Sequence, residues 1–312
     1  MPYSHHSHSG QFCGHATGKL EDVVLEAIRK DFRVYGLSEH VPRYRTEDLY
    51  PEEIGMELDG LSTQFDAFLD EAHRLKVHYA SQITLLVGLE TDYITSIDLE
   101  RLDALLERHG DRIEYIVGSI HHVCGIPIDF DIDTFNRALA HQPGGSVDEQ
   151  MEAFLCSYFE AQFELMQRYR PEIIGHVDLC RLYNPQLRFA EYPRAWELLK
   201  RNIFYAVGYG ALFEVNAAAF RKSWSTAYPG EDVLKVILQA GGRLALSDDS
   251  HGPHAVGLNY HRVADYLRHE GVDELWYLEA SENLNEAGRK VQAIKVPDGW
   301  ESHSLWKSPT KS

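Results

Sequence analysis

Residues 113–122 read Ile113-Glu114-Tyr115-Ile116-Val117-Gly118-Ser119-Ile120-His121-His122. The apolar and aromatic residues at the start of this stretch predict a short buried strand. Two adjacent histidines follow the strand, where a loop is expected to begin. The stretch is thus a strand followed directly by residues that can bind metal ions. We look for the same pattern in the rest of the sequence.

The same unit recurs on both sides of this stretch. Further strands are predicted at 34–37, 83–87, 172–174, 212–215, 243–246 and 275–278. Helical periodicity lies between most of them, at about 20–28, 65–75, 99–108, 148–168, 232–240 and 261–269. Alternating strands and helices are typical of a parallel sheet, and seven or eight such units favour a closed or distorted α/β barrel.

Two segments lack regular periodicity, residues 39–61 and 125–147. We interpret both as long loops that cover one end of the barrel. No linker, low-complexity tract or repeat divides the chain. We therefore expect a single domain over residues 1–312.

Polar clusters follow six of the expected strands. In addition to His121-His122, they are Ser4–His8 after Tyr3, Ser38–His40, Gly88–Asp92, Gly175–Asp178 and Ser247–His251. In barrel enzymes the active site lies at the C-terminal ends of the strands. The six clusters are therefore predicted to converge on one mouth.

The spacing within the clusters also fits metal binding. His6 and His8 are two residues apart, so on an extended chain their side chains leave the same face. Asp249 and His251 repeat this geometry with a carboxylate and an imidazole. Nitrogen and oxygen ligands suit Zn, Mn or Fe and give no support to a thiolate site.

Simpler explanations exist for each cluster taken alone. A His-rich N-terminus can be a tag remnant, but serines interrupt this one and it continues into Gly10–His15. Glu90 alone would be read as a solvated acid, and Asp249-Ser250-His251 alone as a helix N-cap. Only the joint pattern indicates a metal centre.

Taken in order, these motifs resemble those of the PHP (polymerase and histidinol phosphatase) superfamily. The residues that carry the resemblance are His6-Ser7-His8, His40, Glu90, His121, His176-Val177-Asp178 and Asp249-Ser250-His251. Three sequence segments are similar to the histidinol-phosphatase branch, particularly its fungal-type members. They are Gly118–His122, Gly175–Asp178 and Glu214–Lys222. One departure is Ala217-Ala218-Ala219-Phe220, where the branch more often carries a polar stretch.

The resemblance implies a distorted (β/α)7 TIM-like barrel with two to three divalent metal ions. It implies that His6, His8, Glu90 and Asp249 hold one ion and that His15, His40 and His251 hold a second. Glu90, His121 and His176 would hold a third, so that Glu90 bridges two ions. It also implies that the chain hydrolyses L-histidinol phosphate to L-histidinol and phosphate, a step of histidine biosynthesis.

Hydrolysis of a phosphomonoester needs an in-line nucleophile and positive charge on the phosphate oxygens. We assign the nucleophile to a hydroxide that bridges two ions. Arg181 and Arg221 are the candidates to bind the phosphate dianion, because a guanidinium binds it bidentately. Asp249 and His254 are candidate proton donors to the leaving group. Asp92, Asp178, Glu47 and Asp48 are candidates to contact its organic part.

The overall composition limits the partners. The formal net charge of −18 disfavours long-range attraction to nucleic acid or to an anionic membrane. The N-terminus lacks the apolar core of a signal peptide. Cys13, Cys124, Cys156 and Cys180 lack paired spacing, which fits reduced thiols in a cytoplasmic protein.

Three functions remain open at this level. The first is a phosphatase for a small phosphomonoester, with L-histidinol phosphate the first substrate to test. The second is a PHP phosphoesterase or nuclease that acts on another phosphate ester, although basic runs for a nucleic-acid groove are absent from the sequence. The third is a non-catalytic metal-binding module, which degraded motifs would favour. Every expected ligand is present, and the oligomeric state stays open.

Overall fold

The computed structural model describes residues 2–307. The strands are β1 (Tyr3–Ser4), β2 (Ser7–His8), β3 (Val34–His40), β4 (Thr84–Glu90), β5 (Tyr115–Gly118), β6 (His122–Val123), β7 (Ile126–Pro127), β8 (Ile173–Ile174), β9 (Leu212–Asn216), β10 (Arg243–Ser247), β11 (Ser250–His251), β12 (Trp276–Ala280) and β13 (Val291–Lys295). The helices are α1 (Leu20–Arg29), α2 (Leu58–His78), α3 (Ser96–His109), α4 (Ile132–Ala140), α5 (Val147–Tyr169), α6 (Pro193–Gly208), α7 (Glu231–Gln239) and α8 (Tyr260–His269).

A seven-stranded parallel sheet forms the centre of the molecule, in the order β1-β3-β4-β5-β8-β9-β10. The two edges of this sheet approach one another through the short parallel pair β2–β11, in which Ser7 is opposite Ser250. Ser4 Oγ also donates to Asp248 Oδ1 at 2.9 Å, which ties the end of β1 to the residue after β10. The sheet is therefore a nearly closed, distorted barrel, as predicted.

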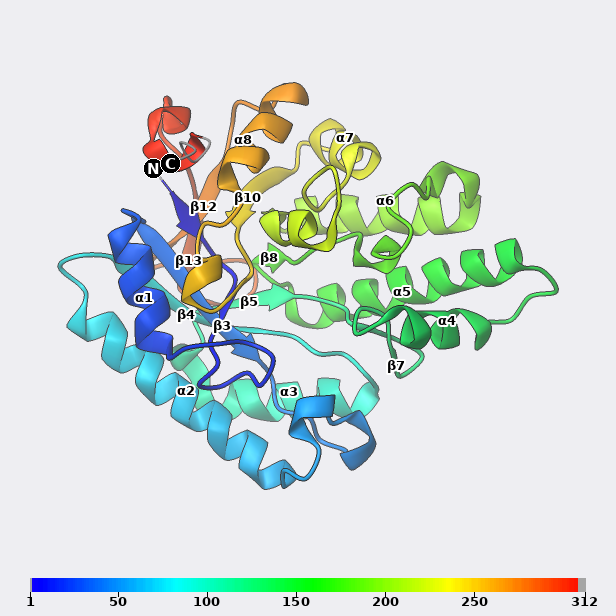
Figure 1. The fold of residues 1–312 in the computed structure, drawn as a ribbon, viewed down its shortest axis with the longest axis horizontal. Coiled ribbons are helices and arrows are strands. Elements are labelled where there is room, and N and C mark those ends of the chain that lie inside the picture. Colours follow the sequence, from blue (N-terminus) through cyan, green and yellow to red (C-terminus); the bar gives the residue numbers. More distant parts are fainter. Residues whose placement is uncertain (1, 308–312) are drawn as a thin grey trace.

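Helices cover the outside of the barrel (Figure 1). Helix α1 shows why they pack there: its buried residues Leu20, Val23, Val24 and Ala27 recur at helical spacing and make one apolar stripe. The strands are buried on both faces, which explains their nearly continuous apolar runs. The buried side chains form one core cluster that includes residues from Tyr3 to Trp306. The single domain over residues 1–312 stays a prediction. Residues 1 and 308–312 of the predicted domain lie outside the described residues.

Two glycines make room for an aromatic side chain inside the barrel. A Cβ on Gly36 would lie 2.2 Å from Tyr115 Oη, and a Cβ on Gly88 would lie 2.6 Å from the Tyr115 ring. The Tyr115 hydroxyl donates to the backbone oxygen of His5 at 2.8 Å. This bond holds the backbone that carries His6 into the barrel.

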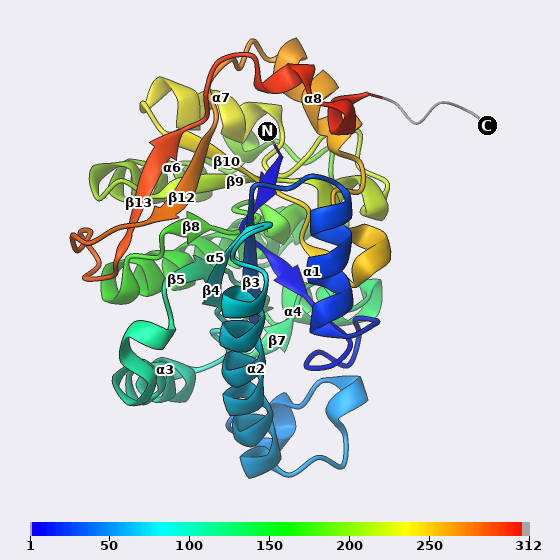
Figure 2. The ribbon, with the colours of Figure 1, turned by 90° about the vertical axis from the view of Figure 1, so that its left-hand side faces the viewer.

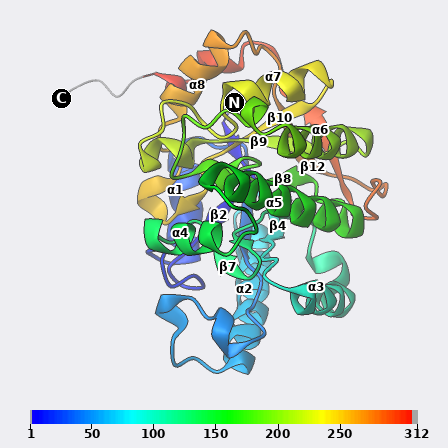
Figure 3. The same ribbon diagram turned by 90° about the vertical axis from the view of Figure 1, so that its right-hand side faces the viewer.

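The prediction of a loop over residues 125–147 was wrong in part. Helix α4 lies within it and contacts α5 and β7 (Figure 3). Asp131 caps this helix by accepting from the backbone N–H of Thr134 at 2.7 Å, and Phe135 and Ala138 are buried. The other segment, 39–61, contains two short 3-10 turns, Thr46–Asp48 and Pro51–Glu53, and the start of α2.

The last predicted strand lies outside the barrel sheet. Strand β12 pairs antiparallel with β13, and this hairpin lies on the flank of the barrel (Figure 2). The backbone N–H of Leu278 in β12 donates to His5 Nε2 at 2.9 Å, so the hairpin covers the N-terminal segment. Of the helices within residues 2–307, none is long and apolar enough to cross a membrane.

Candidate metal centre

The polar clusters meet because neighbouring parallel strands end at the same level. In the sheet register His40 at the end of β3 is opposite Glu90 at the end of β4, and Glu90 is opposite Val117 of β5. His121 and His176 follow β5 and β8, while Asp249 follows β10. With His6 and His8 at β2, six separate segments place polar side chains at one end of the barrel, as the sequence predicts.

Glu90 is at the centre of this group. Its Oε2 lies 3.0 Å from His6 Nε2, 3.2 Å from His8 Nε2 and 3.2 Å from His40 Nδ1. Its Oε1 lies 3.1 Å from His121 Nε2 and 3.2 Å from His176 Nε2. Each carboxylate oxygen thus faces a different set of imidazoles, the arrangement that a bridging ligand needs.

The remaining predicted ligands complete the group on one side. Asp249 Oδ1 lies 3.8 Å from both His6 Nε2 and His8 Nε2. His15, His40 and His251 each offer a nitrogen, and the three nitrogens lie within 4.8 Å of one another. The structure therefore brings all nine predicted ligand residues together: His6, His8, His15, His40, Glu90, His121, His176, Asp249 and His251. Their assignment to individual ions stays a prediction.

The donor atoms fit divalent cations. His6 Nε2, His8 Nε2 and His40 Nδ1 are buried, and within residues 2–307 none of them makes a hydrogen bond of good geometry, although Glu90 Oε2 lies 3.0–3.2 Å from each. A buried unpaired nitrogen is unfavourable, whereas a nitrogen lone pair directed at a cation is satisfied. Burial by itself raises the pKa of Glu90, but His6, His40 and His121 outweigh it and hold the pKa well below its usual range. Glu90 therefore stays ionised, as a metal ligand must be.

Carboxylates contact the Nδ1 atom of several of these imidazoles, on the side of the ring away from the metal centre. Glu214 Oε1 lies 2.7 Å from His6 Nδ1, Glu39 Oε2 lies 3.3 Å from His8 Nδ1, and Asp129 Oδ2 lies 2.9 Å from His121 Nδ1. Glu52 contacts His15 Nδ1 in the same way. Such a carboxylate fixes the ring and its tautomer, so that the other nitrogen is free for a metal ion.

The turn after β10 aims Asp249 at the centre. Asp249 has a φ of 45°, in the left-handed region that few non-glycine residues occupy. Asn216 Nδ2 donates to Asp249 Oδ2 at 3.2 Å, and Arg221 donates to the backbone oxygens of Asp248 and Asp249 at 2.9 and 2.7 Å. These bonds hold the strained turn in place.

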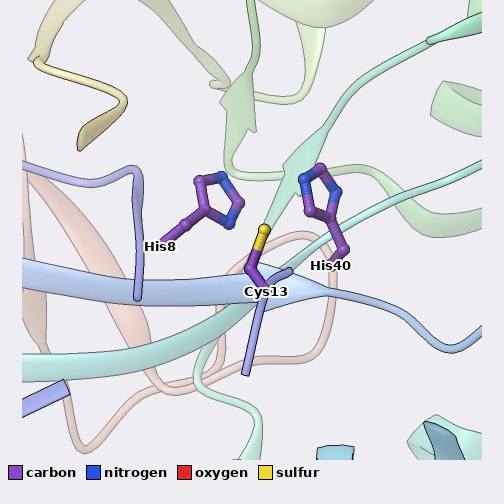
Figure 4. A group of neighbouring side chains, drawn as sticks. All are labelled: His8, Cys13 and His40. Atoms are coloured by element: carbon purple, nitrogen blue, oxygen red, sulfur yellow. The ribbon is translucent and has the colours of Figure 1, made fainter. Parts of the chain in front are cut away.

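A sulfur atom lies beside the nitrogen and oxygen donors, which the sequence interpretation did not include. Figure 4 shows the thiol of Cys13 next to the rings of His8 and His40, and the three donor atoms lie within 4.8 Å of one another. Cys13 Sγ also lies 3.2 Å from His15 Nε2. Burial, followed by the Glu39 carboxylate, raises the pKa of the Cys13 thiol. Both favour the neutral thiol over the thiolate.

A cavity of about 340 Å³ opens onto these residues. Most of the predicted ligands line it, together with Arg221 and with residues that the sequence did not predict as site residues: Tyr50, Pro51, Glu52, Asp129, Phe130, Leu179, Leu182, Ala218, Lys222 and Tyr228. Arg221 is thus placed where a phosphate group could reach it. Asp249 lines the cavity as well.

Arg181 does not lie at the cavity, so we correct its assignment. Its guanidinium is buried and donates to Asp178 Oδ2 at 2.7 Å, to Asp232 Oδ1 at 2.7 Å and to the backbone oxygen of Leu187 at 3.0 Å. The side chain also lies over the Phe189 ring. Arg181 therefore joins segments of the fold, and this packing argues against a role in phosphate binding.

His254 and the predicted acids also need correction. His254 is exposed on a short turn after β11, where its Nδ1 lies 3.3 Å from Thr17 Oγ1, and it is not part of the cavity lining. The four acids proposed for the organic half of the substrate are not part of the lining either, although Asp92 lies directly behind it, 3.5 Å from His40 Nδ1. Asp92 binds Arg43, Asp178 binds Arg181, and Glu47 and Asp48 bind Arg45.

Comparison with known proteins identifies the family. A model of the PHP domain matches residues 4–218, the part of the chain that contains seven of the nine predicted ligands. The chain belongs to the PHP domain family. Asp249 and His251 lie beyond the matched range.

Relatives and solved structures agree with this assignment. The chain is 46% identical over 303 residues to a probable histidinol-phosphatase of Schizosaccharomyces pombe, covering 96% of each chain. It is 30% identical over 315 residues to the histidinol-phosphatase of Saccharomyces cerevisiae, covering 90% of this chain and 92% of that one. The histidinol phosphate phosphatase of Lactococcus lactis, solved with zinc, L-histidinol and phosphate, has the same fold, with a TM-score of 0.59, 18% identity and coverage of 88% and 95%.

The residues that sequence reasoning missed fall into two groups. Glu39 and Glu214 lie within sequence segments already assigned to PHP motifs. Their position in these motifs could have marked them as residues that contact the ligands. Tyr50, Glu52, Asp129 and Phe130 come from the two segments interpreted as loops, and no local pattern distinguishes them. Only the course of the chain brings them to the cavity.

Proposed function

We propose that this chain is a metal-dependent histidinol-phosphatase that hydrolyses L-histidinol phosphate to L-histidinol and phosphate. The observation that carries the proposal is the Glu90 carboxylate with five imidazole nitrogens at 3.0–3.2 Å, at the base of a cavity that also contains Arg221. Relatives that the chain matches over nine-tenths of its length or more are named histidinol-phosphatases.

Two to three divalent ions, Zn, Mn or Fe, are the proposed cofactors. His6, His8, Glu90 and Asp249 would hold one ion, His15, His40 and His251 a second, and Glu90, His121 and His176 a third. Bound there, such ions supply positive charge to the phosphate oxygens and lower the pKa of water from about 15.7 towards 7. Zinc in the Lactococcus lactis enzyme supports this choice of cofactor.

The chain's own residues complete the phosphate site. Arg221 has N–H donors beyond the two that bind the carbonyls of Asp248 and Asp249, and Lys222 lines the cavity beside it. In a protein with a formal net charge of −18, these two cations are the local attraction for a dianion. Neither candidate proton donor from the sequence is favoured here. His254 does not line the cavity. Asp249 is assigned to an ion, and although burial raises its pKa, His6, His251 and Arg221 outweigh this and hold the pKa well below its usual range, so the carboxylate stays ionised.

The direct test is phosphate release by the purified, metal-loaded protein. We expect kcat/KM for L-histidinol phosphate to exceed that for p-nitrophenyl phosphate and for a sugar phosphate by about a hundredfold, or ~2.7 kcal/mol. A flat profile would leave a metallophosphatase of another specificity. Preference for a short single-stranded oligonucleotide would make the protein a nuclease.

The phosphate site has its own test. Arg221→Ala removes a charge-assisted contact to phosphate, so kcat/KM should fall about 10–150-fold. Metal content must be measured on the same sample, because Arg221 also holds the turn that carries Asp249. An active Arg221→Ala enzyme with unchanged kcat/KM would show that phosphate binds elsewhere.

A further inference from the structure

The cavity lining is chemically divided between two sides. The loop after β9 contributes Ala218, Arg221 and Lys222 to one side. The segments after β3 and after β5 contribute Tyr50, Glu52, Asp129 and Phe130 to another, and we call these four residues the acidic–aromatic wall. Strands β3 and β5 are separated from β9 in the sheet order, so Arg221 and Lys222 line a different part of the mouth from Glu52 and Asp129.

The aromatic part of the wall offers a fixed ring and an exposed ring against which a flat ligand can pack. The rings of Tyr50 and Phe130 lie 4.9 Å apart and almost perpendicular, at 88°. Tyr50 is fixed, because its hydroxyl donates to Asp92 Oδ1 at 2.8 Å and the Arg43 guanidinium lies 4.6 Å from its ring centre. Phe130 is 37% exposed, although an aromatic ring of this size is ordinarily buried. A ligand in the cavity would cover it.

The acidic part of the wall has an unused hydrogen-bond acceptor. Asp129 Oδ2 binds His121 Nδ1, but the buried Oδ1 has no hydrogen-bond partner among the residues that the structure describes. Buried carboxylate oxygens are normally paired, so an N–H donor supplied by a ligand would satisfy it. Glu52 adds a second carboxylate to the same side.

We infer that the acidic–aromatic wall binds the imidazole-bearing half of the substrate and so determines its specificity. This inference rests on the proposed function, which places the phosphate group at the metal centre and Arg221. An imidazole is flat, carries N–H donors and is partly cationic near neutral pH, so it can pack on Phe130 and Tyr50 while donating to Asp129. A purely anionic sugar phosphate has none of these features.

The test compares two substrates that differ in the imidazole. L-histidinol phosphate carries it, whereas O-phosphoethanolamine keeps the phosphate and an amine without a ring. Phe130→Ala should lower kcat/KM for L-histidinol phosphate about 10-fold or more and leave that for O-phosphoethanolamine within about 2-fold. Phe204→Ala is the matched control, because Phe204 is 59% exposed on α6 and does not line the cavity; it should change neither value.

Asp129→Asn is the second variant, and it needs a metal measurement because Asp129 also holds His121. With metal content unchanged, we expect the same selective loss for L-histidinol phosphate. Inhibition by free L-histidinol should weaken in both variants, while inhibition by inorganic phosphate stays the same. Equal losses for both substrates, or no loss in Phe130→Ala, would overturn the inference. A wild-type protein that does not prefer L-histidinol phosphate would instead overturn the proposed function.

Discussion

At the scale of single residues, the imidazoles of the metal centre depend on acids from other parts of the chain. Glu214 contributes most clearly: its Oε1 contacts His6 Nδ1 at 2.7 Å, and its Oε2 accepts from the backbone N–H of His176 at 2.8 Å and from Asn216 Nδ2 at 2.9 Å. One buried carboxylate therefore orients a ligand ring and the backbone of a second ligand residue.

Glu214→Gln should test this role. The amide keeps the size of the side chain but lacks the charge that holds His6, so metal affinity or activity should fall about 10–100-fold. Metal content at limiting metal concentration, with kcat/KM measured in parallel, reports the effect. Glu107→Gln on the exposed side of α3 is the control. Unchanged metal affinity in Glu214→Gln would mean that His6 is held by packing alone.

Arg181 makes the opposite point, because a residue predicted to bind phosphate is paired with two acids within the fold. Removing it in Arg181→Ala leaves the buried Asp178 carboxylate without its cationic partner, with only the Gly230 N–H still bound to Oδ2, and should lower the free energy of unfolding by about 3–5 kcal/mol. Urea unfolding measures this. Arg108→Ala, which breaks only the exposed pair with Asp66, should lower it by no more than about 1 kcal/mol.

The same Arg181→Ala sample also distinguishes support from catalysis. The fraction that remains folded should keep the KM of the wild type. A large increase in KM with unchanged stability would restore Arg181 to the phosphate site.

At the scale of elements, the barrel interior depends on close contact between strands β3, β4 and β5. Gly36 and Gly88 leave space that the Tyr115 ring fills, and the Tyr115 hydroxyl holds the backbone at His5. A methyl group at Gly36 would also lie 2.8 Å from His5 Cα, which is backbone and cannot move aside easily.

Gly36→Ala should therefore destabilise the protein by about 1–3 kcal/mol. Gly60→Ala is the matched control: Gly60 lies in the first turn of α2, and no atom lies within 4 Å of an added Cβ. Here the helix should gain up to about 1 kcal/mol from the lower flexibility of alanine. Thermal unfolding of both variants checks the opposite signs, and equal effects would contradict the contact argument.

At the scale of the whole molecule, six segments far apart in the sequence supply the ligands of one centre. Metal ions that bind all of them stabilise the folded state and not the unfolded chain, in which the ligands are dispersed. Many carboxylates also converge at this end of the barrel, among them Glu90, Asp249, Glu214, Glu39 and Asp129. Bound cations reduce the repulsion between them.

Removal of metal by a chelator should therefore abolish phosphate release and lower the melting temperature together. Addition of Zn, Mn or Fe should restore both. Glu90→Gln should lower the metal content by more than one site's worth, because Glu90 is assigned to two ions. Full activity of the metal-free protein would refute the assignment of the site.

Much of this arrangement could be predicted from local sequence pattern. Buried parallel strands appear as apolar runs, and the residue that follows each run is placed at the C-terminal edge of the sheet. For this reason the barrel and the convergence of the clusters could be predicted without coordinates. The set of nine ligand residues, with His15 outside any strand end, was instead implied by the resemblance to the PHP superfamily. Helix α4 could also have been predicted from the sequence, because Ile132, Phe135 and Leu139 recur at helical spacing.

The rest was decided by tertiary structure, because it depends on which side chains meet across elements. Glu214 and His6 are 208 residues apart, and nothing in either motif states that they pair. Arg181 and Arg221 are equally plausible phosphate ligands in the sequence; only the packing of Asp178 and Asp232 around one of them separates their roles. Phe130 and Tyr50 meet because two irregular segments fold over the same mouth. Local periodicity reports which face of an element is buried, whereas the partner on that face is set by strand register and loop course.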